Sequence, residues 1–207
     1  MGKNDFSHML RKNYFSDKAW AKIQKTRIGI AGAGGLGSNV AVALVRSGFK
    51  YFEIIDFDKV ELSNLNRQQY FLPQVGKFKI EALKENLLSI NPDLDITGHT
   101  IKLTSQNALN YFADSDIIFE AFDKVEFKKL ILEAYGNTKK IIISGNGMAG
   151  ASNKNELKIR KISSLHFLVG DGVSSVSEEP VFAPRVAACA ALMASVALEI
   201  IIGNDYQ

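Results

Sequence analysis

Four glycines between a short apolar segment and a helical pattern are placed to bring the main chain against a phosphate. Gly32, Gly34 and Gly37 have the G-x-G-x-x-G spacing of a nucleotide-binding turn, and Gly35 adds a fourth glycine. The turn follows a predicted strand (27–32) and opens a predicted helix, whose free N–H groups can face an anion. The motif predicts a nucleotide site, and its alternative is a tight turn without a ligand.

A second polar group follows the next predicted strand. Asp56 lies about 20 positions after the last glycine, the spacing at which an acid binds a ribose hydroxyl in dinucleotide-binding folds. The segment 56–68, DFDKVELSNLNRQ, then adds Asp58, three amides and Arg67. A nicotinamide site does not need this many polar groups. The segment therefore predicts that something beyond a ribose is bound.

These residues must be positioned by elements that alternate along the chain. Apolar segments of strand length are separated by helical patterns, as expected of a parallel sheet with helical crossovers. The sequence predicts an α/β fold: a Rossmann-like, doubly wound, mostly parallel sheet with a short C-terminal strand and helix extension. The predicted strands are 27–32, 51–57, 116–123 and 139–147, and the predicted helices between them are 35–48, 76–92 and 126–136.

We predict one domain over residues 1–207, with an N-terminal helical segment over about 1–25 and a C-terminal extension over about 151–207. The extension contains an exposed strand, then a polar loop (170–180), and then an Ala-rich helix that begins near Pro184. The extension therefore differs in character from the regular alternation before it.

The composition is that of an ordinary globular protein, with 46% hydrophobic and 23% charged residues. The 25 basic and 22 acidic side chains give a net charge of +3 without a basic run, which argues against a nucleic-acid partner. The apolar segment from Val186 contains Glu199 and predicts a buried helix, so no membrane partner is expected. The N-terminus lacks a secretory signal pattern, and the single cysteine, Cys189, allows no internal disulfide. These features predict a cytoplasmic protein.

The sequence resembles the ThiF/MoeB/HesA superfamily, the bacterial relatives of ubiquitin-activating enzymes. This resemblance implies that ATP is used to adenylate the C-terminal glycine carboxylate of a small ubiquitin-like carrier. The short length and the missing cysteines look most like the compact second type of ThiF, which is associated with thiamine biosynthesis. The resemblance extends from about residue 11 to 203 and rests on GAGGLGS (32–38), DFDKVELSNLNRQ (56–68), VGKFKIEAL (75–83), FEAFD (119–123) and the C-terminal segment 180–201.

The resemblance gives each matched residue a task. Arg67 would clamp the β- and γ-phosphates with its planar guanidinium, and Lys79 would neutralise charge at the α-phosphate. Lys77, two residues earlier, ranks second for that role. Asp123 would hold Mg²⁺ on the triphosphate, with capping of the next helix as its alternative, and Asp56 would bind the ribose. The other expected nucleotide contacts are Gly32, Gly34, Gly35, Gly37, Asp58, Asn64 and Gln68, and Asn66 either joins them or stabilises its own turn.

The sequence departs from the superfamily pattern in three places. It lacks the paired CxxC motifs that bind structural zinc in larger members, so no zinc is expected. The segment in place of the crossing loop, 172–180, contains no cysteine, so a covalent carrier intermediate there is unsupported. Arg11 matches the first arginine of a stretch through which one superfamily subunit contacts ATP in its partner, but Tyr14 replaces the second.

We therefore predict an ATP- and Mg²⁺-dependent adenylyltransferase, a nucleotidyltransferase that activates a sulfur carrier ending in Gly-Gly and releases pyrophosphate. A ThiS-like carrier of thiamine thiazole synthesis is the first choice, and the resemblance implies a homodimer. The alternatives are a molybdopterin-type carrier, a tRNA-modifying relative, a catalytically silent partner subunit and, more distantly, a nicotinamide oxidoreductase. Arg67, Lys79 and Asp123 together favour an enzyme over a silent subunit. The segment 144–150, SGNGMAG, is either a close approach for the carrier tail or a turn.

Overall fold

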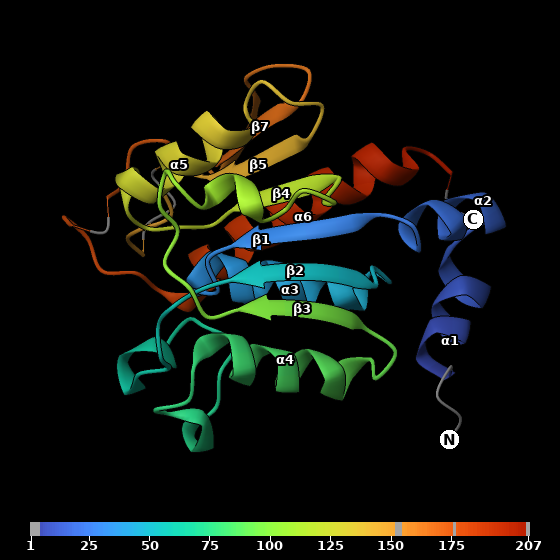
Figure 1. The fold of residues 1–207 in the computed structure, drawn as a ribbon, viewed down its shortest axis with the longest axis horizontal. Coiled ribbons are helices and arrows are strands. Elements are labelled where there is room, and N and C mark those ends of the chain that lie inside the picture. The colour runs from blue at the N-terminus through green and yellow to red at the C-terminus, as the bar shows by residue number, and fades with distance from the viewer. Residues whose placement is uncertain (1–4, 152–154, 176, 206–207) are drawn as a thin grey trace.

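One seven-stranded sheet runs through the molecule (Figure 1). The computed structural model describes residues 5–151, 155–175 and 177–205. The strands are β1 (Arg27–Ala31), β2 (Tyr51–Ile55), β3 (Asp95–His99), β4 (Ile117–Glu120), β5 (Ile141–Gly145), β6 (Lys158–Lys161) and β7 (His166–Gly170). Their order is β3-β2-β1-β4-β5-β7-β6, and every neighbouring pair is parallel except β6 with β7.

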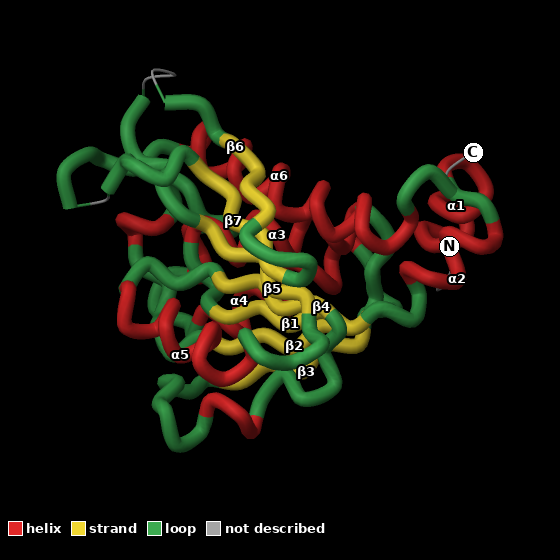
Figure 2. Tube along the Cα trace, turned by 90° about the horizontal axis from the view of Figure 1, so that it is seen from above, coloured by secondary structure: helices red, strands yellow, loops and turns green. Residues whose placement is uncertain are grey.

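Helices cover both faces of this sheet (Figures 1 and 2). The helices in the described residues are α1 (Asp5–Tyr14), α2 (Asp17–Ile23), α3 (Gly35–Arg46), α4 (Lys79–Ile90), α5 (Val125–Tyr135) and α6 (Ala183–Ile202), with short 3₁₀ helices at Leu62–Asn64, Leu72–Gln74 and Ala108–Asn110. The larger core lies between the sheet and α3, α4 and α6. A smaller core lies under α5 on the other face. The predicted α/β class and mostly parallel sheet are confirmed.

The central strands are apolar on both sides because each strand serves both cores. In β1, Ile28 and Ile30 belong to the larger core, whereas Ala31 belongs to the smaller one. The same holds for β4, where Ile117 and Phe119 alternate with Ile118. Successive side chains of a strand point to opposite faces, so a strand covered on both faces reads as a continuous apolar run.

The connections leave β1 in opposite directions, and this creates a crevice. From β1 the chain passes to β2 and β3 on one side, and β4 then lies against the other side of β1. Ala31 at the end of β1 is in register with both Ile55 of β2 and Glu120 of β4, so the turns after these strands open at one edge. Open α/β sheets bind ligands at such a point.

The helix α6 is long and apolar enough to cross a membrane by length and composition alone, but half of it is buried against the rest of the molecule. It packs on α3, β5 and β7 through side chains that include Val186, Met193 and Ala197. The core helix of a globular protein has the same properties. The packing agrees with the buried helix predicted from the sequence.

The helices α1 and α2 lie with both chain ends at the edge of the sheet opposite the crevice (Figure 1). Arg11 of α1 forms an exposed ion pair with Asp17, at 2.9 Å between Nη2 and Oδ1. Arg11 therefore lies far from the carboxyl ends of the strands in its own chain.

Candidate nucleotide site

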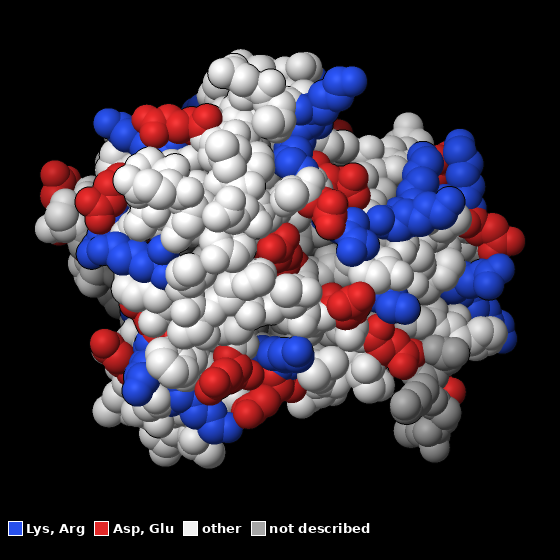
Figure 3. Space-filling view, viewed as in Figure 1, with Lys and Arg blue, Asp and Glu red and all other residues white. Residues whose placement is uncertain are grey.

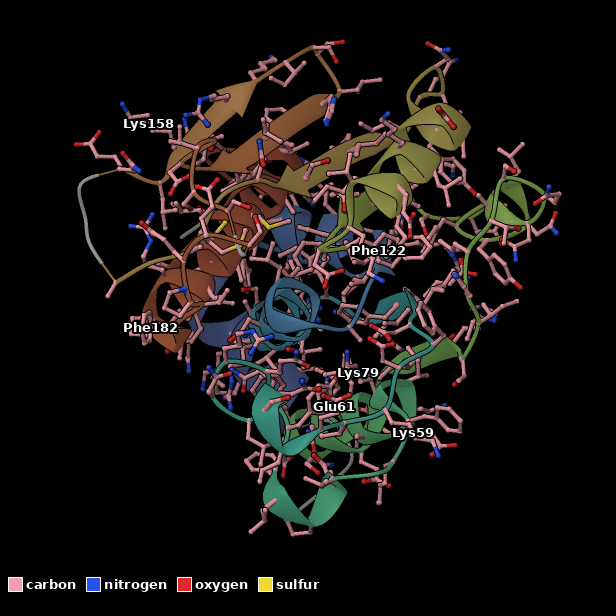
Figure 4. All side chains as sticks on the ribbon, turned by 90° about the vertical axis from the view of Figure 1, so that its left-hand side faces the viewer. Lys59, Glu61, Lys79, Phe122, Lys158 and Phe182 are labelled. Carbon is pink, nitrogen blue, oxygen red and sulfur yellow. The ribbon has the colours of Figure 1, made fainter. Side chains whose placement is uncertain are left out.

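A cavity of about 760 Å³ opens at the carboxyl ends of the central strands. Figure 4 looks onto this edge and shows Lys79, Phe122 and Phe182 on three different segments around it. The volume is within the usual range for small-molecule sites. The predicted residues that line the cavity are Gly32, Gly34, Gly35, Asp56, Asp58, Arg67, Gln68, Lys79 and Asp123.

The glycine turn forms one side of the cavity. Gly32 has φ +100°, and a Cβ there would lie only 3.1 Å from the carbonyl oxygen of Ala121, so glycine is required. Gly34 precedes the first residue of α3, so the helix N-terminus faces the cavity. Gly37 is not part of the lining: its Cα faces the backbone of Gly32 and leaves no room for a side chain. It brings α3 against β1 rather than contacting a ligand.

Asp56 braces the turn from the end of β2. Its Oδ2 accepts a hydrogen bond from the Ala33 N–H at 2.7 Å, and its Oδ1 accepts one from the Asp58 N–H at 2.8 Å. Burial raises the pKa of Asp56, while Lys79 and the two backbone hydrogen bonds oppose that change. Each carboxylate oxygen keeps a further lone pair for a hydroxyl of a ligand.

Lys79 is the first residue of α4 and is almost fully buried. Its Nζ lies 2.8 Å from Oδ2 of Asp58; the Lys79 side chain is 8% exposed and that of Asp58 is 50% exposed. The partly exposed carboxylate of Asp58 thus holds the Lys79 ammonium group at the cavity wall. A phosphate of a ligand can take the place of this carboxylate as the partner of the ammonium group. Lys77, the competing candidate, does not line the cavity and instead pairs with Glu85 at 2.9 Å.

Arg67 lines the cavity in a half-buried position. Its Nη1 donates to the Ser63 carbonyl at 3.2 Å and to Oδ1 of Asn66 at 2.8 Å. Asn66 also lines the cavity, and its Nδ2 donates to the Val181 carbonyl at 3.2 Å. Asn66 therefore orients the guanidinium group and ties its loop to the segment before α6.

Gln68 has an unsatisfied acceptor at the cavity wall. Its side chain is buried, and within the described chain its Oε1 has no hydrogen-bond partner. Buried amide oxygens are normally hydrogen-bonded, so a donor from a ligand, such as a ribose hydroxyl, fits this position. Asn64 differs, because it does not line the cavity: its Oδ1 accepts from the Glu61 N–H at 3.1 Å and so stabilises the 3₁₀ turn.

Asp123 lies in the turn between β4 and α5, three residues beyond the end of β4, and its carboxylate is exposed at the cavity. The N-cap residue of α5 is Lys124, so Asp123 does not cap this helix. Within the described ranges no three His, Cys, Asp or Glu side chains gather to hold a metal ion. A magnesium ion at Asp123 would therefore take its other ligands from phosphate oxygens and water.

A cluster of three aromatic side chains in the lining, Phe57, Phe122 and Phe127, was not predicted. The ring centroids of Phe122 and Phe127 lie 5.4 Å apart, and those of Phe57 and Phe127 lie 6.2 Å apart. They offer an apolar surface suited to a purine base. The one signal in the sequence is that Phe57 and Phe122 are direct neighbours of Asp56 and Asp123.

The other side of the cavity is formed by residues 145–148, 172–175 and 179–182, which we call the second wall. Gly147 and Gly172 both have positive φ, and the Ser174 hydroxyl accepts from the Ala149 N–H at 3.0 Å. Val173 and Phe182 are 70% and 43% exposed at its rim. Of the segment 144–150, the first two residues end β5, and residues 145–148 line the cavity. The approach of a carrier tail to this segment stays a prediction.

Cys189 is expected to be chemically inert. It is fully buried in α6, its Sγ lies 3.5 Å from the Val169 carbonyl, and burial raises the pKa of the thiol to about 12. We predict no alkylation by iodoacetamide while the protein is folded and rapid alkylation in denaturant, followed by mass spectrometry. Cys189→Ala should retain full activity, and its inactivity in a folded variant would contradict a purely structural thiol.

Comparison with known proteins gives consistent matches. The ThiF family model matches residues 7–207. The adenylyltransferase and sulfurtransferase UBA4 of Candida glabrata is 31% identical over 88% of this chain and 44% of the relative, and MOCS3 of Aedes aegypti is 36% identical over 61% and 29%. The chain thus spans less than half the length of these relatives.

Solved structures share the fold. The E. coli tRNA N6-threonylcarbamoyladenosine dehydratase TcdA, solved with ATP, has a TM-score of 0.83 at 22% identity and covers 96% of this chain and 94% of its own. The structure of E. coli MccB with AMPCPP and MccA has a TM-score of 0.70 at 22% identity. The match covers 88% of this chain and 57% of the MccB chain. At this identity the likeness extends to the fold alone.

Proposed function

Because the chain belongs to the ThiF family, we propose that it is an ATP-dependent adenylyltransferase that converts a carboxylate into an acyl-adenylate and releases pyrophosphate. The observation that carries the proposal is the meeting of the glycine turn, Arg67, Lys79 and Asp123 at one cavity. The names of the curated relatives agree with this class of enzyme. A catalytically silent partner subunit would not need these groups together.

The chemistry requires charge stabilisation more than proton transfer. A carboxylate oxygen attacks the α-phosphorus of ATP, the new P–O bond forms, and the bond to pyrophosphate breaks. In this proposal Lys79 neutralises the α-phosphate and Arg67 holds the departing phosphates; both side chains line the cavity. The attacking carboxylate is already ionised near neutral pH, so no general base is needed. Magnesium bound at Asp123 would reduce the negative charge of the triphosphate.

We propose a ubiquitin-like sulfur carrier ending in Gly-Gly as the second substrate, with a ThiS-type carrier first and a molybdopterin-type carrier second. The sulfurtransferase names of the relatives support a sulfur carrier in general. The order of the two carriers follows the resemblance to the compact second type of ThiF and is decided by the exchange assay below. We also propose a homodimer, in which α1 of one subunit, remote from its own cavity, is available to the other.

A second candidate substrate is the carboxylate of N6-threonylcarbamoyladenosine in tRNA, because the structure matches nearly the whole length of an enzyme named for it. The charge pattern favours the carrier instead. On the face shown in Figure 3, basic and acidic side chains lie interspersed among uncharged ones, whereas tRNA binding needs a broad basic surface.

The proposal is tested by exchange of labelled pyrophosphate into ATP in the presence of Mg²⁺. The ThiS-type carrier, the molybdopterin-type carrier and the modified tRNA are compared at equal concentration, with truncated carriers lacking Gly-Gly as controls. Exchange that depends on an intact carrier supports the proposed function and identifies its partner. ATP binding without exchange for any of the three substrates would overturn it.

Asp123→Asn should raise the Mg²⁺ concentration needed for half-maximal exchange several-fold, because an amide is a weaker ligand for magnesium than a carboxylate. The measurement is the exchange rate as a function of Mg²⁺ at saturating ATP. Glu126→Gln, an exposed acidic residue in the first turn of α5 that does not line the cavity, is the matched control. An unchanged Mg²⁺ dependence in Asp123→Asn would argue against this ligand.

A further inference from the structure

A buried ion pair lies directly behind the second wall. Nη2 of Arg185 is 2.7 Å from Oδ2 of Asp171, and the two side chains are 8% and 1% exposed. Asp171 immediately follows β7, and Arg185 is the third residue of α6. The pair therefore joins the two ends of the connection that supplies most of the second wall. Neither residue lines the cavity itself.

The Asp171 carboxylate also fixes the wall residues next to it. Its Oδ1 accepts from the N–H groups of Val173 and Ser174 at 2.9 and 2.8 Å, and its Oδ2 accepts from the Ser174 hydroxyl at 2.7 Å. Burial disfavours the charged form, but these hydrogen bonds and Arg185 outweigh burial and lower the pKa of Asp171. The Asp171 carboxylate is thus ionised, and its hydrogen bonds fix the positions of Val173 and Ser174.

Asp171 and Gly172 are also hydrogen-bonded to the part of the second wall that follows β5. The Asp171 N–H donates to the Gly147 carbonyl at 2.9 Å, and the Gly172 N–H donates to the Asn146 carbonyl at 3.0 Å. Gly147 packs so closely on the Asp171 carboxylate that a side chain would not fit. Residues 145–149 and 171–174 are therefore held as one unit.

Stability alone does not explain this pair. Replacing a buried ion pair by well-packed hydrophobic residues of similar volume is often neutral for stability, because desolvating two charges offsets their attraction. In addition, a cation in the first turn of a helix lies in the unfavourable field of the helix N-terminus. The benefit of the pair lies in the geometry that it imposes on the wall.

We propose that Asp171 and Arg185 are positioning residues that hold the second wall in the shape that receives the tail of the carboxylate substrate. This inference rests on the proposed adenylation. The glycine turn, Asp56 and Lys79, which are expected to bind ATP, belong to other segments of the cavity lining than the second wall. The loop that carries Arg67 meets the second wall through the hydrogen bond from Asn66 Nδ2 to the Val181 carbonyl. Gly147 and Gly172 of the second wall have positive φ and no side chain, which suits the close approach of a narrow extended tail. The pair therefore sets the KM for the carboxylate substrate and leaves that for ATP unchanged.

The test is the double variant Asp171→Asn/Arg185→Gln, which removes both charges and leaves no unpaired buried charge. We expect the KM for the best substrate of the exchange assay to rise about ten-fold, with the KM for ATP changed less than about two-fold. Arg185→Lys, which keeps the charge, should lie between the double variant and wild type. Hydrogen–deuterium exchange should increase in residues 171–182 and stay unchanged in α3.

The control is Lys158→Gln, which breaks a nearby exposed ion pair with Glu156, 3.3 Å long, and should leave both KM values unchanged. A folded double variant with the wild-type KM for the carboxylate substrate would overturn this proposal alone, as would an equal rise in both KM values. A wild-type protein without exchange would overturn the proposed function, and this inference with it.

Discussion

Replacing Lys79 by alanine is expected to lower the rate of carrier-dependent pyrophosphate exchange about 10²- to 10³-fold, the usual effect of removing one charged or hydrogen-bonding group from a transition-state site. The Lys79 ammonium is nearly buried at the cavity wall and is the cation at the start of α4. The affinity for ATP should fall much less, because the glycine turn and Arg67 remain.

The loss should not reflect unfolding. Asp58, the partner of Lys79, is 50% exposed, so its carboxylate returns to water when the lysine is removed. The variant therefore leaves no buried charge without a partner. The matched control is Lys77→Ala, which removes a cation two residues away that pairs with Glu85 outside the cavity. Equal losses in the two variants would contradict a specific role for Lys79.

The family and the centre of the site could be predicted because their signals are local in the sequence. The resemblance to the ThiF superfamily is confirmed by the family match over residues 7–207. The glycine turn, Asp56 and Lys79 each lie at the junction of a strand or helix, where the apolar pattern changes. Once the strands are predicted to be parallel, their carboxyl ends are expected at one edge of the sheet, so these junctions are expected to lie together.

Residues within a single polar segment could not be sorted in this way. Arg67 and Gln68 line the cavity, but Asn64, three or four positions earlier, points into the 3₁₀ turn. Short irregular turns have no regular period from which the facing side can be predicted. The strands β3 and β7 were missed because their apolar signal is short: β3 (DITGH) has a single large apolar residue, and β7 (HFLVG) has only three consecutive ones between histidine and glycine.

The second wall was hidden because it depends on contacts between distant segments. Asp171 meets Gly147 and Arg185 only after β5, β7 and α6 have packed together. No spacing rule relates such positions. The Glu120–Lys128 pair is a similar case, since Glu120 lies within an apolar strand and gives no sign of its partner.

Glu120→Ala is expected to destabilise the protein by about 3 kcal/mol, the lower end of the range for leaving a buried charge unpaired. Glu120 is 1% exposed at the end of β4, and its carboxylate lies 3.0 Å from Nζ of Lys128, which is 22% exposed. Without Glu120, the ammonium group of Lys128 keeps, among the described residues, its hydrogen bond to the Gly145 carbonyl at 2.8 Å. For a chain of this size the melting temperature should fall about 2–4 °C per kcal/mol, measured by calorimetry.

The control is the double variant Glu120→Leu/Lys128→Met, which replaces both charges by apolar side chains. It should be close to wild type in stability, because no charge remains buried. Both variants lose the hydrogen bond from the Phe122 N–H to Glu120, so this bond does not distinguish them. An equal loss of stability in the double variant would assign the effect to packing and not to the unpaired ammonium.

The reverse variant, Lys128→Met, should instead depend on pH. Burial raises the pKa of Glu120 above its ordinary value of 4.5, and the loss of the opposing lysine raises it further. The folded protein then binds this proton more tightly than the unfolded chain. The stabilisation that comes from binding this proton is fully present below pH 4.5. It is lost as the pH rises through the pKa of Glu120 in the folded protein. Lys128→Met should therefore lose less stability relative to wild type at about pH 5 than at about pH 8. A deficit equal at both pH values would show that the carboxyl group of Glu120 does not take up a proton when Lys128 is removed.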